Sequence, residues 1–257
     1  MKPEIKTYDT KYGKISLFSN EVYISRPFEY GHYWDEDTLL LLKEYIDPSK
    51  NILEIGAHCG TSTLVYLSFL NPEQKIYAYE PQKELFELLK RNIEQNNLQD
   101  RIIAINKAVF CFSGNGYMND VDLDGGGGNI LERYNTEGNL PCNYGGTCIG
   151  KNGEEVEFTT IDDINLENIG FIHVDAQGSE NFIFSKSINT ISKYKPVIYY
   201  ENNQEYCKYL YNNVCKTYYP QYQFESQFNI RKFCIDDLQY TQYIERFNNG
   251  NDDLIIL

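Results

Sequence analysis

Short apolar runs alternate with amphipathic stretches along most of the chain from residue 51 onward. In the amphipathic stretches apolar residues recur every three or four positions, as on one face of a helix, whereas the short runs have the composition of buried strands. The expected strands are 51–55, 75–80, 101–106, 170–175 and 196–201, and the expected helices are 61–70, 82–96, 179–193 and 203–216. This alternation predicts the α/β class, with a Rossmann-like, doubly wound, mostly parallel sheet covered by helices on both faces.

The N-terminal residues do not follow this alternation and are expected to form an extension. Residues 12–25 contain two strand-like runs around Ser19-Asn20, which predicts a β-hairpin with its turn at that pair. Residues 35–46 carry apolar side chains at helical spacing, so a helix is expected there. We therefore predict a hairpin and helix extension over 1–50 and a main domain over 51–257.

The rhythm of strands and helices is interrupted at about residues 108–169, in a glycine-rich segment that includes four consecutive glycines at 125–128. Such a long interruption predicts a functional insertion or a mobile loop, with a plain surface elaboration as the alternative. Two more strands are expected in the tail, around Tyr222–Phe224 and Asp253–Leu257. They are predicted to close the sheet with an antiparallel C-terminal edge.

The sequence LEIGAHCGTST stands where the first strand passes into a helix. In a doubly wound sheet, ligands bind beyond the carboxyl ends of the strands, where the strand order reverses. Gly56 would permit a tight turn and a close backbone approach there, and Gly60 would let the next helix begin against a ligand. Two glycines with the upstream acid Glu54 differ from the three glycines of a dinucleotide motif, which disfavours a diphosphate ligand. A purely structural turn is the alternative.

An acidic residue also ends the next expected strand, in the sequence KIYAYEP. Glu80 follows Gly56 by about 24 residues, and an acid at such a position typically holds the ribose hydroxyls of an adenosine cofactor. The alternative is an exposed strand-end acid or a helix cap, because Pro81 suits the first turn of the following helix. The glycine pair and the acid together favour the ribose interpretation.

The runs LEIGAHCGTST, IYAYEP and NKAVF resemble class I S-adenosylmethionine-dependent methyltransferases. Further on, TTIDDI, IGFIHVDAQGSE and ISKYKPVIYYE are similar to the FkbM methyltransferase family, in which a run like IDFIKIDVEGAE precedes a strand that ends in glutamate. The similarity spans about residues 50–201 apart from the insertion. It implies the class I methyltransferase fold, S-adenosyl-L-methionine as cofactor, and methyl transfer to an oxygen, often on sugars or natural products.

The resemblance also implies which positions contact the cofactor. They are Glu54, Gly56, Ala57, His58, Gly60, Thr61, Glu80, Asn106 and Ala108. The glycine-rich turn is expected at the methionine end of the cofactor, with Glu80 on the ribose hydroxyls and Ala108 beside the adenine. Class I enzymes often hold the adenine amine with an acid after the third strand. Here that contact is expected from Asn106 or from the backbone.

The candidate catalytic residues gather mainly around the sequence HVDAQGSE, because removing the proton of an acceptor hydroxyl requires a base. The candidates for the base, or for anchoring the acceptor, are Asp175, Glu180, His173, Glu201 and His32. Asp175 at the end of its strand should face the cofactor, with a helix cap as the alternative. His173 is either a proton relay or a core histidine. His32 belongs to the aromatic segment 27–36 around Trp34. This segment would either cover the ligands and stack on a sugar, or pack against the start of the next helix as a hydrophobic staple.

The chain departs from the family pattern at three positions, where His173, Gln177 and Ser179 replace a lysine, a glutamate and a small residue. The missing carboxylate at Gln177 argues against a metal held by this loop alone. Asp175 and Glu201 could still supply two oxygen ligands to a divalent cation. The same departure leaves open a catalytically silent module for cofactor binding or assembly.

Charge and composition limit the partners. A net charge of −14 disfavours nucleic acids and anionic membranes, because phosphates would be repelled. The chain shows neither a membrane-length apolar run nor an apolar signal segment, and its seven cysteines are irregularly spaced, so a cytoplasmic protein with thiols is expected. A Cys142–Cys148 disulfide is the alternative for that pair. The 23 tyrosines would suit a tyrosine-rich surface that pairs subunits in a homo-oligomer.

These observations together predict an S-adenosylmethionine-dependent O-methyltransferase that acts on a hydroxyl of a sugar or glycoconjugate. Two alternatives remain open at this point. One keeps the fold but uses another small molecule as the acceptor, methylated on oxygen or nitrogen. The other is a catalytically silent module that serves cofactor binding or assembly.

Overall fold

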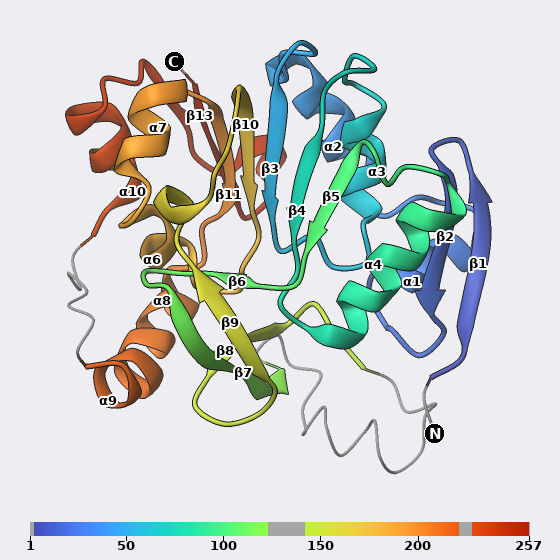
Figure 1. The fold of residues 1–257 in the computed structure, drawn as a ribbon, viewed down its shortest axis with the longest axis horizontal. Coiled ribbons are helices and arrows are strands. Elements are labelled where there is room, and N and C mark those ends of the chain that lie inside the picture. Colours follow the sequence, from blue (N-terminus) through green and yellow to red (C-terminus); the bar gives the residue numbers. More distant parts are fainter. Residues whose placement is uncertain (1–2, 123–141, 221–227, 257) are drawn as a thin grey trace.

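Seven strands form the central sheet of the computed structural model, which describes residues 3–122, 142–220 and 228–256 (Figure 1). In spatial order they are β12 (Gln242–Ile244), β13 (Asp252–Ile256), β11 (Val197–Glu201), β10 (Ile169–Val174), β3 (Asn51–Ile55), β4 (Ile76–Tyr79) and β5 (Ile102–Ile105). Strand β13 runs antiparallel to β11 and β12, while the strands from β11 to β5 pair in parallel. The chain moves outward from β3 to β5 and later returns to β10 on the other side of β3. The strand order therefore reverses between β3 and β10.

This topology confirms the predicted Rossmann-like α/β class. The five expected parallel strands are present, each within one residue of its expected bounds. The antiparallel edge is also confirmed, because β13 covers the strand expected at Asp253–Leu257 except for Leu257, which lies outside the described residues. The strand expected at Tyr222–Phe224 lies outside the described residues as well, and the outer partner of β13 is β12, which was not predicted.

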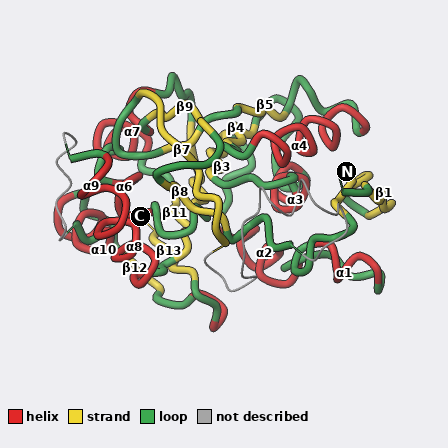
Figure 2. Tube along the Cα trace, turned by 90° about the horizontal axis from the view of Figure 1, so that it is seen from below, coloured by secondary structure: helices red, strands yellow, loops and turns green. Residues whose placement is uncertain are grey.

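Helices cover both faces of the sheet, as Figure 2 shows. The helices whose residues join the first hydrophobic core are α1 (Ser25–Glu29), α2 (Glu36–Leu42), α3 (Thr61–Leu67) and α4 (Lys83–Gln95). Those that join the second core are α6 (Glu180–Phe184), α7 (Ile188–Tyr194) and α10 (Ile230–Lys232). Alternate strand residues supply the two cores, so that Ile52 of β3 packs into the first and Leu53 into the second. A strand buried on both faces reads as a continuous apolar run, which explains why the sequence revealed these strands.

Three expected helices are divided in the structure, and the one expected at 61–70 is α3, which ends at Leu67. The helix expected at 35–46 is α2 followed by a 3₁₀ turn over Lys43–Tyr45. The one expected at 203–216 runs through α8 (Gln204–Leu210), a π-helical turn (Tyr211–Cys215) and α9 (Lys216–Tyr218). The one expected at 179–193 is split into α6 and α7. Ser185 and Ser187 stand at the split and donate hydroxyl hydrogen bonds to helical carbonyls at 2.7 Å, a pattern that competes with a continuous helix.

The predicted insertion contains a second sheet, which crosses the lower part of the view in Figure 1. Its strands, in the order β6-β9-β7-β8, are β6 (Ala108–Val109), β9 (Glu155–Thr159), β7 (Gly114–Asp122) and β8 (Thr147–Gly150). A third hydrophobic core lies between this sheet, α6 and α8, and includes Phe110, Phe158 and Phe182. The glycines at 125–128 lie outside the described residues. The insertion is therefore folded onto the main domain in its described parts.

The N-terminal hairpin is displaced from its predicted place. It consists of β1 (Ile5–Thr10) and β2 (Gly13–Phe18), which pair antiparallel around a turn at Lys11-Tyr12. Ser19-Asn20 form a turn after β2, so the prediction that this pair is the turn of the hairpin was wrong. The side chains of β1 are mostly exposed, which gave this strand no apolar signal. The side chain of Asn92 on α4 fixes the hairpin, accepting from the Ser16 amide at 2.7 Å and donating to the Ser16 carbonyl at 3.0 Å.

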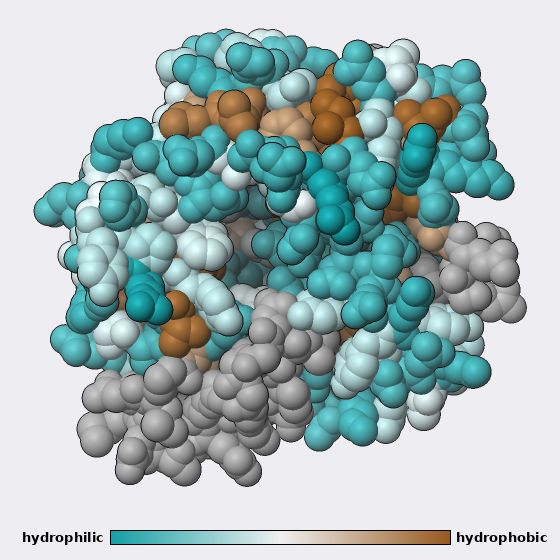
Figure 3. Space-filling view, turned by 180° about the vertical axis from the view of Figure 1, so that it is seen from behind, coloured by the Kyte–Doolittle hydropathy of each residue, from teal (hydrophilic) through white to brown (hydrophobic). Residues whose placement is uncertain are grey.

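Figure 3 shows one face of the surface, and the predicted homo-oligomer stays a prediction. Hydrophobic residues there form separate small groups among hydrophilic ones. Across the described residues, the helices are all too short or too polar to traverse a lipid bilayer. All seven cysteines are thiols, and all of them are buried.

Candidate functional site

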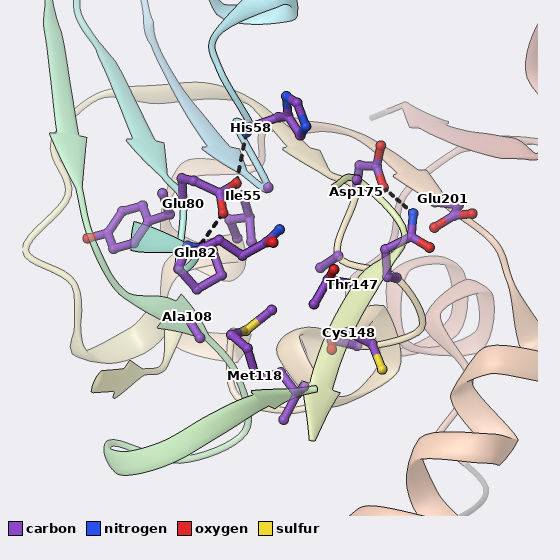
Figure 4. Close-up of a pocket in the computed structure, with 18 of the residues that line it drawn as sticks. Ile55, His58, Glu80, Gln82, Ala108, Met118, Thr147, Cys148, Asp175 and Glu201 are labelled. Atoms are coloured by element: carbon purple, nitrogen blue, oxygen red, sulfur yellow. Dashed lines mark hydrogen bonds between the residues drawn. The ribbon is translucent and has the colours of Figure 1, made fainter. Parts of the chain in front are cut away.

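A cavity of about 450 Å³ opens at the carboxyl ends of β3, β4 and β10, where the strand order reverses (Figure 4). This size lies within the usual range for small-molecule sites. Three parts of the chain contribute to its wall. The main sheet supplies the loops after its strands, the insertion supplies β7 and β8, and the N-terminal extension supplies a segment that includes Trp34.

The glycine turn after β3 is pressed against the end of β10. Gly56 has a φ of +87°, and a Cβ added there would lie 1.8 Å from the backbone carbonyl oxygen of Asp175. The amides of Gly56 and Ala57 both donate to the carbonyl of Tyr79, at 2.9 and 3.0 Å. The predicted close approach at Gly56 is therefore present, but the group that approaches is protein backbone. The turn joins the ends of three neighbouring strands and so fixes the floor of the cavity.

Replacing Gly56 with alanine is expected to lower the free energy of unfolding by about 4 kcal/mol or more, because the new methyl group meets backbone that cannot rotate away. Gly31→Ala is the matched control, since Gly31 also has a positive φ of +76° but has no atom within 4 Å of an added Cβ. Gly31→Ala should lower the free energy of unfolding only by the backbone strain of an alanine at positive φ, about 1–2 kcal/mol. Urea unfolding of both variants measures the difference, and equal losses would contradict the contact with Asp175.

Glu80 is buried at the end of β4 and faces the cavity. Its two carboxylate oxygens accept hydrogen bonds from the backbone amides of His58 at 2.9 Å and Gln82 at 2.8 Å (Figure 4). Burial raises the pKa of Glu80 to about 8, although the two amides act in the opposite direction. Asn106 stands behind this residue and donates to the carbonyls of Glu80 and Pro81 at 2.9 and 2.8 Å. Asn106 thus supports the loop that carries Glu80 and does not line the cavity itself.

Glu54 and His173 lie behind the glycine turn, on the side of α3. The carboxylate of Glu54 accepts from the hydroxyls of Ser62 at 2.5 Å and Thr63 at 2.6 Å, and lies 3.7 Å from Nδ1 of His173. Burial alone would lower the pKa of His173, but the neighbouring Glu54 raises it, and the net shift is upward. The hydroxyl of Tyr66 is 3.3 Å from the same Nδ1. These polar groups connect β3, β10 and α3 within the core and do not line the cavity.

The wall opposite Glu80 carries two further carboxylates. Asp175 follows directly after β10, and Glu201 is the last residue of β11. Both face the cavity in Figure 4. The side-chain amide of Gln177 donates to Asp175 at 3.3 Å. Glu180 lies beneath this loop, where it accepts from the Ala176 amide at 2.9 Å, and burial raises its pKa to about 8. Glu180 therefore shapes the loop from below and does not line the cavity.

Six of the fourteen residues predicted to bind the cofactor or to act in catalysis line the cavity. They are Gly56, His58, Glu80, Ala108, Asp175 and Glu201. The other eight do not line it: Glu54, Ala57, Gly60, Thr61, Asn106, His173, Glu180 and His32. Alternation along the strands turns Glu54 and His173 toward α3, and Gly60 and Thr61 begin that helix. His32 lines a different cavity, together with Tyr8 and Phe28, and its predicted role as a base stays a prediction.

The insertion contributes cavity residues that the sequence did not single out. Met118 on β7 and Thr147 and Cys148 on β8 line the wall between Glu80 and Asp175 (Figure 4). The only sign in the sequence that the insertion contributes to the site was its position between the strands that carry the motifs. It could not identify which of its residues would face a ligand.

Several polar atoms in this wall are buried without a hydrogen-bond partner among the described residues. They are Nε2 of His58, Oγ1 of Thr147, Oε1 of Gln177 and Oγ of Ser179. Such atoms cost free energy unless something satisfies them, so they indicate a polar ligand. Within residues 3–122, 142–220 and 228–256, three or more histidine, cysteine or acidic side chains do not come together as they would around a metal ion.

Comparisons with known proteins agree with this geometry. A family model described as the methyltransferase FkbM domain matches residues 54–228, which is more than half of the chain. No curated protein matches the chain. Among solved structures, methyltransferase FkbM from Methylobacillus flagellatus KT aligns with a TM-score of 0.50 and 14% identity.

That alignment covers 82% of this chain and 44% of the Methylobacillus chain, so this chain spans less than half of the longer protein. An O-methyltransferase from Bacillus cereus, solved in complex with SAH, aligns with a TM-score of 0.44 and 16% identity over 93% of this chain and 84% of that chain. At 14% identity, the likeness to the Methylobacillus structure concerns the fold alone.

Proposed function

The chain belongs to the FkbM methyltransferase family, and on this premise we propose that it is an S-adenosylmethionine-dependent methyltransferase that methylates a hydroxyl oxygen of a sugar or glycoconjugate. We further propose that residues 51–257 form the catalytic domain and 1–50 its extension. The buried cysteine thiols support a reducing compartment such as the cytoplasm.

We propose that S-adenosylmethionine occupies the half of the cavity next to Glu80. The Glu80 carboxylate suits the two ribose hydroxyls, because it is fixed by backbone amides on one side and faces the cavity on the other. Ala108, Val109 and Met118 line the same cavity and provide an apolar surface for the adenine. When bound, the cofactor supplies a methyl group on a positively charged sulfur.

The observation that carries the choice of a hydroxyl acceptor is the position of Asp175 across the cavity from Glu80. A carboxylate there would accept the proton of an acceptor hydroxyl and orient its oxygen. Among the other candidates for the base, only Glu201 also lines the cavity. Trp34 lines it as well, and an aromatic face is a common stacking surface for a sugar ring.

The proposal is tested in two steps. Calorimetry with S-adenosylmethionine measures binding, and absence of binding at about millimolar cofactor would contradict the assignment of the cavity. A panel of sugars, glycans and non-sugar alcohols is then screened for production of S-adenosylhomocysteine. Turnover limited to the non-sugar alcohols or to amines would contradict the sugar acceptor while leaving the methyltransferase intact.

The affinity for the cofactor is expected to increase with pH up to about 8, the pKa of Glu80. Below that pH the free protein holds a protonated carboxyl, which must lose its proton before it can accept from both ribose hydroxyls. The dissociation constant should therefore fall about tenfold for each pH unit and level off above pH 8. His58 stays neutral throughout, because burial lowers its pKa to about 4. Calorimetry from about pH 6 to pH 9 measures this slope, and a flat profile would contradict it.

A further inference from the structure

The N-terminal extension borders the mouth of the cavity. Tyr23, Ile24 and Trp34 line the cavity from this part of the chain. Ile24 and Trp34 are partly buried and pack against the first hydrophobic core. Tyr23 lines the same cavity but is 46% exposed, so its side chain is shared between the cavity and the solvent. The ring of Tyr23 therefore stands at the mouth, and the other two side chains stand further in.

Hydrogen bonds on two sides fix the backbone that carries Tyr23. The buried carboxylate of Glu21 accepts from the amides of Tyr23 at 3.1 Å and Ser25 at 2.7 Å. Val22 donates its amide to the carbonyl of Cys142 in the insertion at 3.1 Å, and the Cys142 amide donates back to this segment at 2.9 Å. A tyrosine held in this way offers a large amphipathic surface, and little conformational freedom is lost when a ligand packs on it.

The extension meets the cavity on the side of Glu201. Helix α2 begins two residues after Trp34, and the hydroxyl of Thr38 in its first turn accepts from the side chain of Asn248 at 3.4 Å. Three residues further along this C-terminal segment, Asn251 lines the cavity. Its carbonyl accepts at 3.1 Å from the backbone amide that follows Glu201. The aromatic wall thus belongs to the half of the cavity that is proposed for the acceptor.

The volume of the cavity limits how much of an acceptor it can hold. About 450 Å³ lies toward the lower end of the range for pockets that bind one drug-sized molecule. S-adenosylmethionine is a molecule of that size, and its proposed place is the half next to Glu80. The half beside Asp175 then has room for about one sugar ring. Any further part of an acceptor would lie at the mouth, where Tyr23 stands.

Resting on the proposed methylation of a sugar hydroxyl, we propose that the acceptor is an oligosaccharide chain of two or more rings whose second ring stacks on Tyr23. The ring that carries the reactive hydroxyl lies beside Asp175, and Trp34 borders it further in. Aromatic faces suit this role because the C–H groups of a sugar ring pack on them while the sugar hydroxyls stay in water. Tyr23 is thus a specificity-determining residue that favours a sugar chain over a single sugar.

Series of glycosides that differ only in the number of rings test this proposal. The full-length protein is saturated with S-adenosylhomocysteine and examined by saturation-transfer NMR. The probes are methyl glycosides of glucose, galactose, mannose and N-acetylglucosamine, each as a single ring and as its disaccharides and trisaccharides. At least one disaccharide is expected to bind about tenfold more tightly than the corresponding single ring. Equal affinities within every series, or no binding by any disaccharide, would overturn the proposal.

Variants at the mouth locate the second ring. Tyr23→Ala is expected to lower the affinity for that disaccharide about tenfold, to the level of the single ring, and Tyr23→Phe to keep it within about threefold. Tyr30→Ala is the matched control, because Tyr30 is 69% exposed in the same part of the extension but does not line the cavity. Thermal melting verifies that all three variants fold. An unchanged disaccharide affinity in Tyr23→Ala, or an equal loss in Tyr30→Ala, would overturn the assignment.

Turnover measured in parallel separates this inference from the proposed function. Methylation of a single ring and of its disaccharide with equal kcat/KM would uphold sugar methylation and overturn the site for a second ring. A gain in disaccharide binding that depends on Tyr23, without methyl transfer to any of these glycosides, would uphold the stacking site and contradict the proposed reaction.

Discussion

Replacing Glu80 with glutamine is expected to weaken S-adenosylmethionine binding about a hundredfold or more while the protein remains folded. A hydrogen bond to a charged group contributes about 1.5–3 kcal/mol, and two ribose hydroxyls would each donate one to this carboxylate. Glutamine keeps the size of the side chain but has only one acceptor oxygen. That oxygen would be shared between the cofactor and the amides of His58 and Gln82, which now use both oxygens of Glu80.

Calorimetry on the two proteins at about pH 8 measures this effect, because Glu80 is then about half ionised in the free protein. Glu154→Gln is the matched control. Glu154 also accepts from a backbone amide, that of Lys83 at 3.0 Å, but it does not line the cavity. Its replacement should leave cofactor affinity unchanged. A similar loss in both variants would mean that Glu80 acts only by holding its loop, and the ribose assignment would then be wrong.

The strands and the location of the site could be predicted from the sequence because both depend on short-range patterns. A strand buried on two faces needs a continuous apolar run, as in Ile52–Ile55 apart from Glu54, and parallel strands place their carboxyl ends at one edge. Gly56 and Glu80 stand directly at those ends. Their positions in the chain therefore indicated their place in the fold.

The side of the sheet on which Glu54 lies could not be predicted from these patterns. Glu54 precedes Gly56 by two residues and was expected to contact the cofactor. Side chains alternate along a strand, so Glu54 faces the same side as Ile52, toward α3. The sequence contains this alternation, but it does not reveal which face is nearer to the ligand. That depends on how the helices pack against the two faces of the sheet.

The contribution of the insertion was hidden for a different reason. Met118 and Ile149 are partners across β7 and β8, although they are 31 positions apart in the chain. Pairing over such a distance is set by the register of the folded sheet, which polar, glycine-rich strands specify weakly in the sequence. Thr147 reaches the cavity only because of this register. Its place in the site therefore required the structure.

The second large effect is expected at Asp175. Asp175→Asn should lower kcat by about 10²–10⁴-fold on an acceptor that the protein methylates, because an amide cannot take the hydroxyl proton. Asparagine keeps the shape of the side chain and its hydrogen bond with Gln177 at 3.3 Å. Cofactor affinity should change little, since Glu80 and the apolar wall lie on the other side of the cavity. Initial rates at saturating cofactor, together with calorimetry, separate the two quantities.

Glu201→Gln is the comparison that makes this result specific, because Glu201 is the other candidate carboxylate in the cavity wall. If Asp175 is the base, Glu201→Gln should mainly raise KM for the acceptor and leave kcat within about tenfold of the original value. A larger loss of kcat at Glu201 than at Asp175 would move the base to the end of β11. Full turnover by Asp175→Asn would remove Asp175 from both roles, as base and as acceptor anchor. Asp175 is therefore assigned as the base only if Asp175→Asn causes a large loss of kcat and Glu201→Gln causes a smaller one.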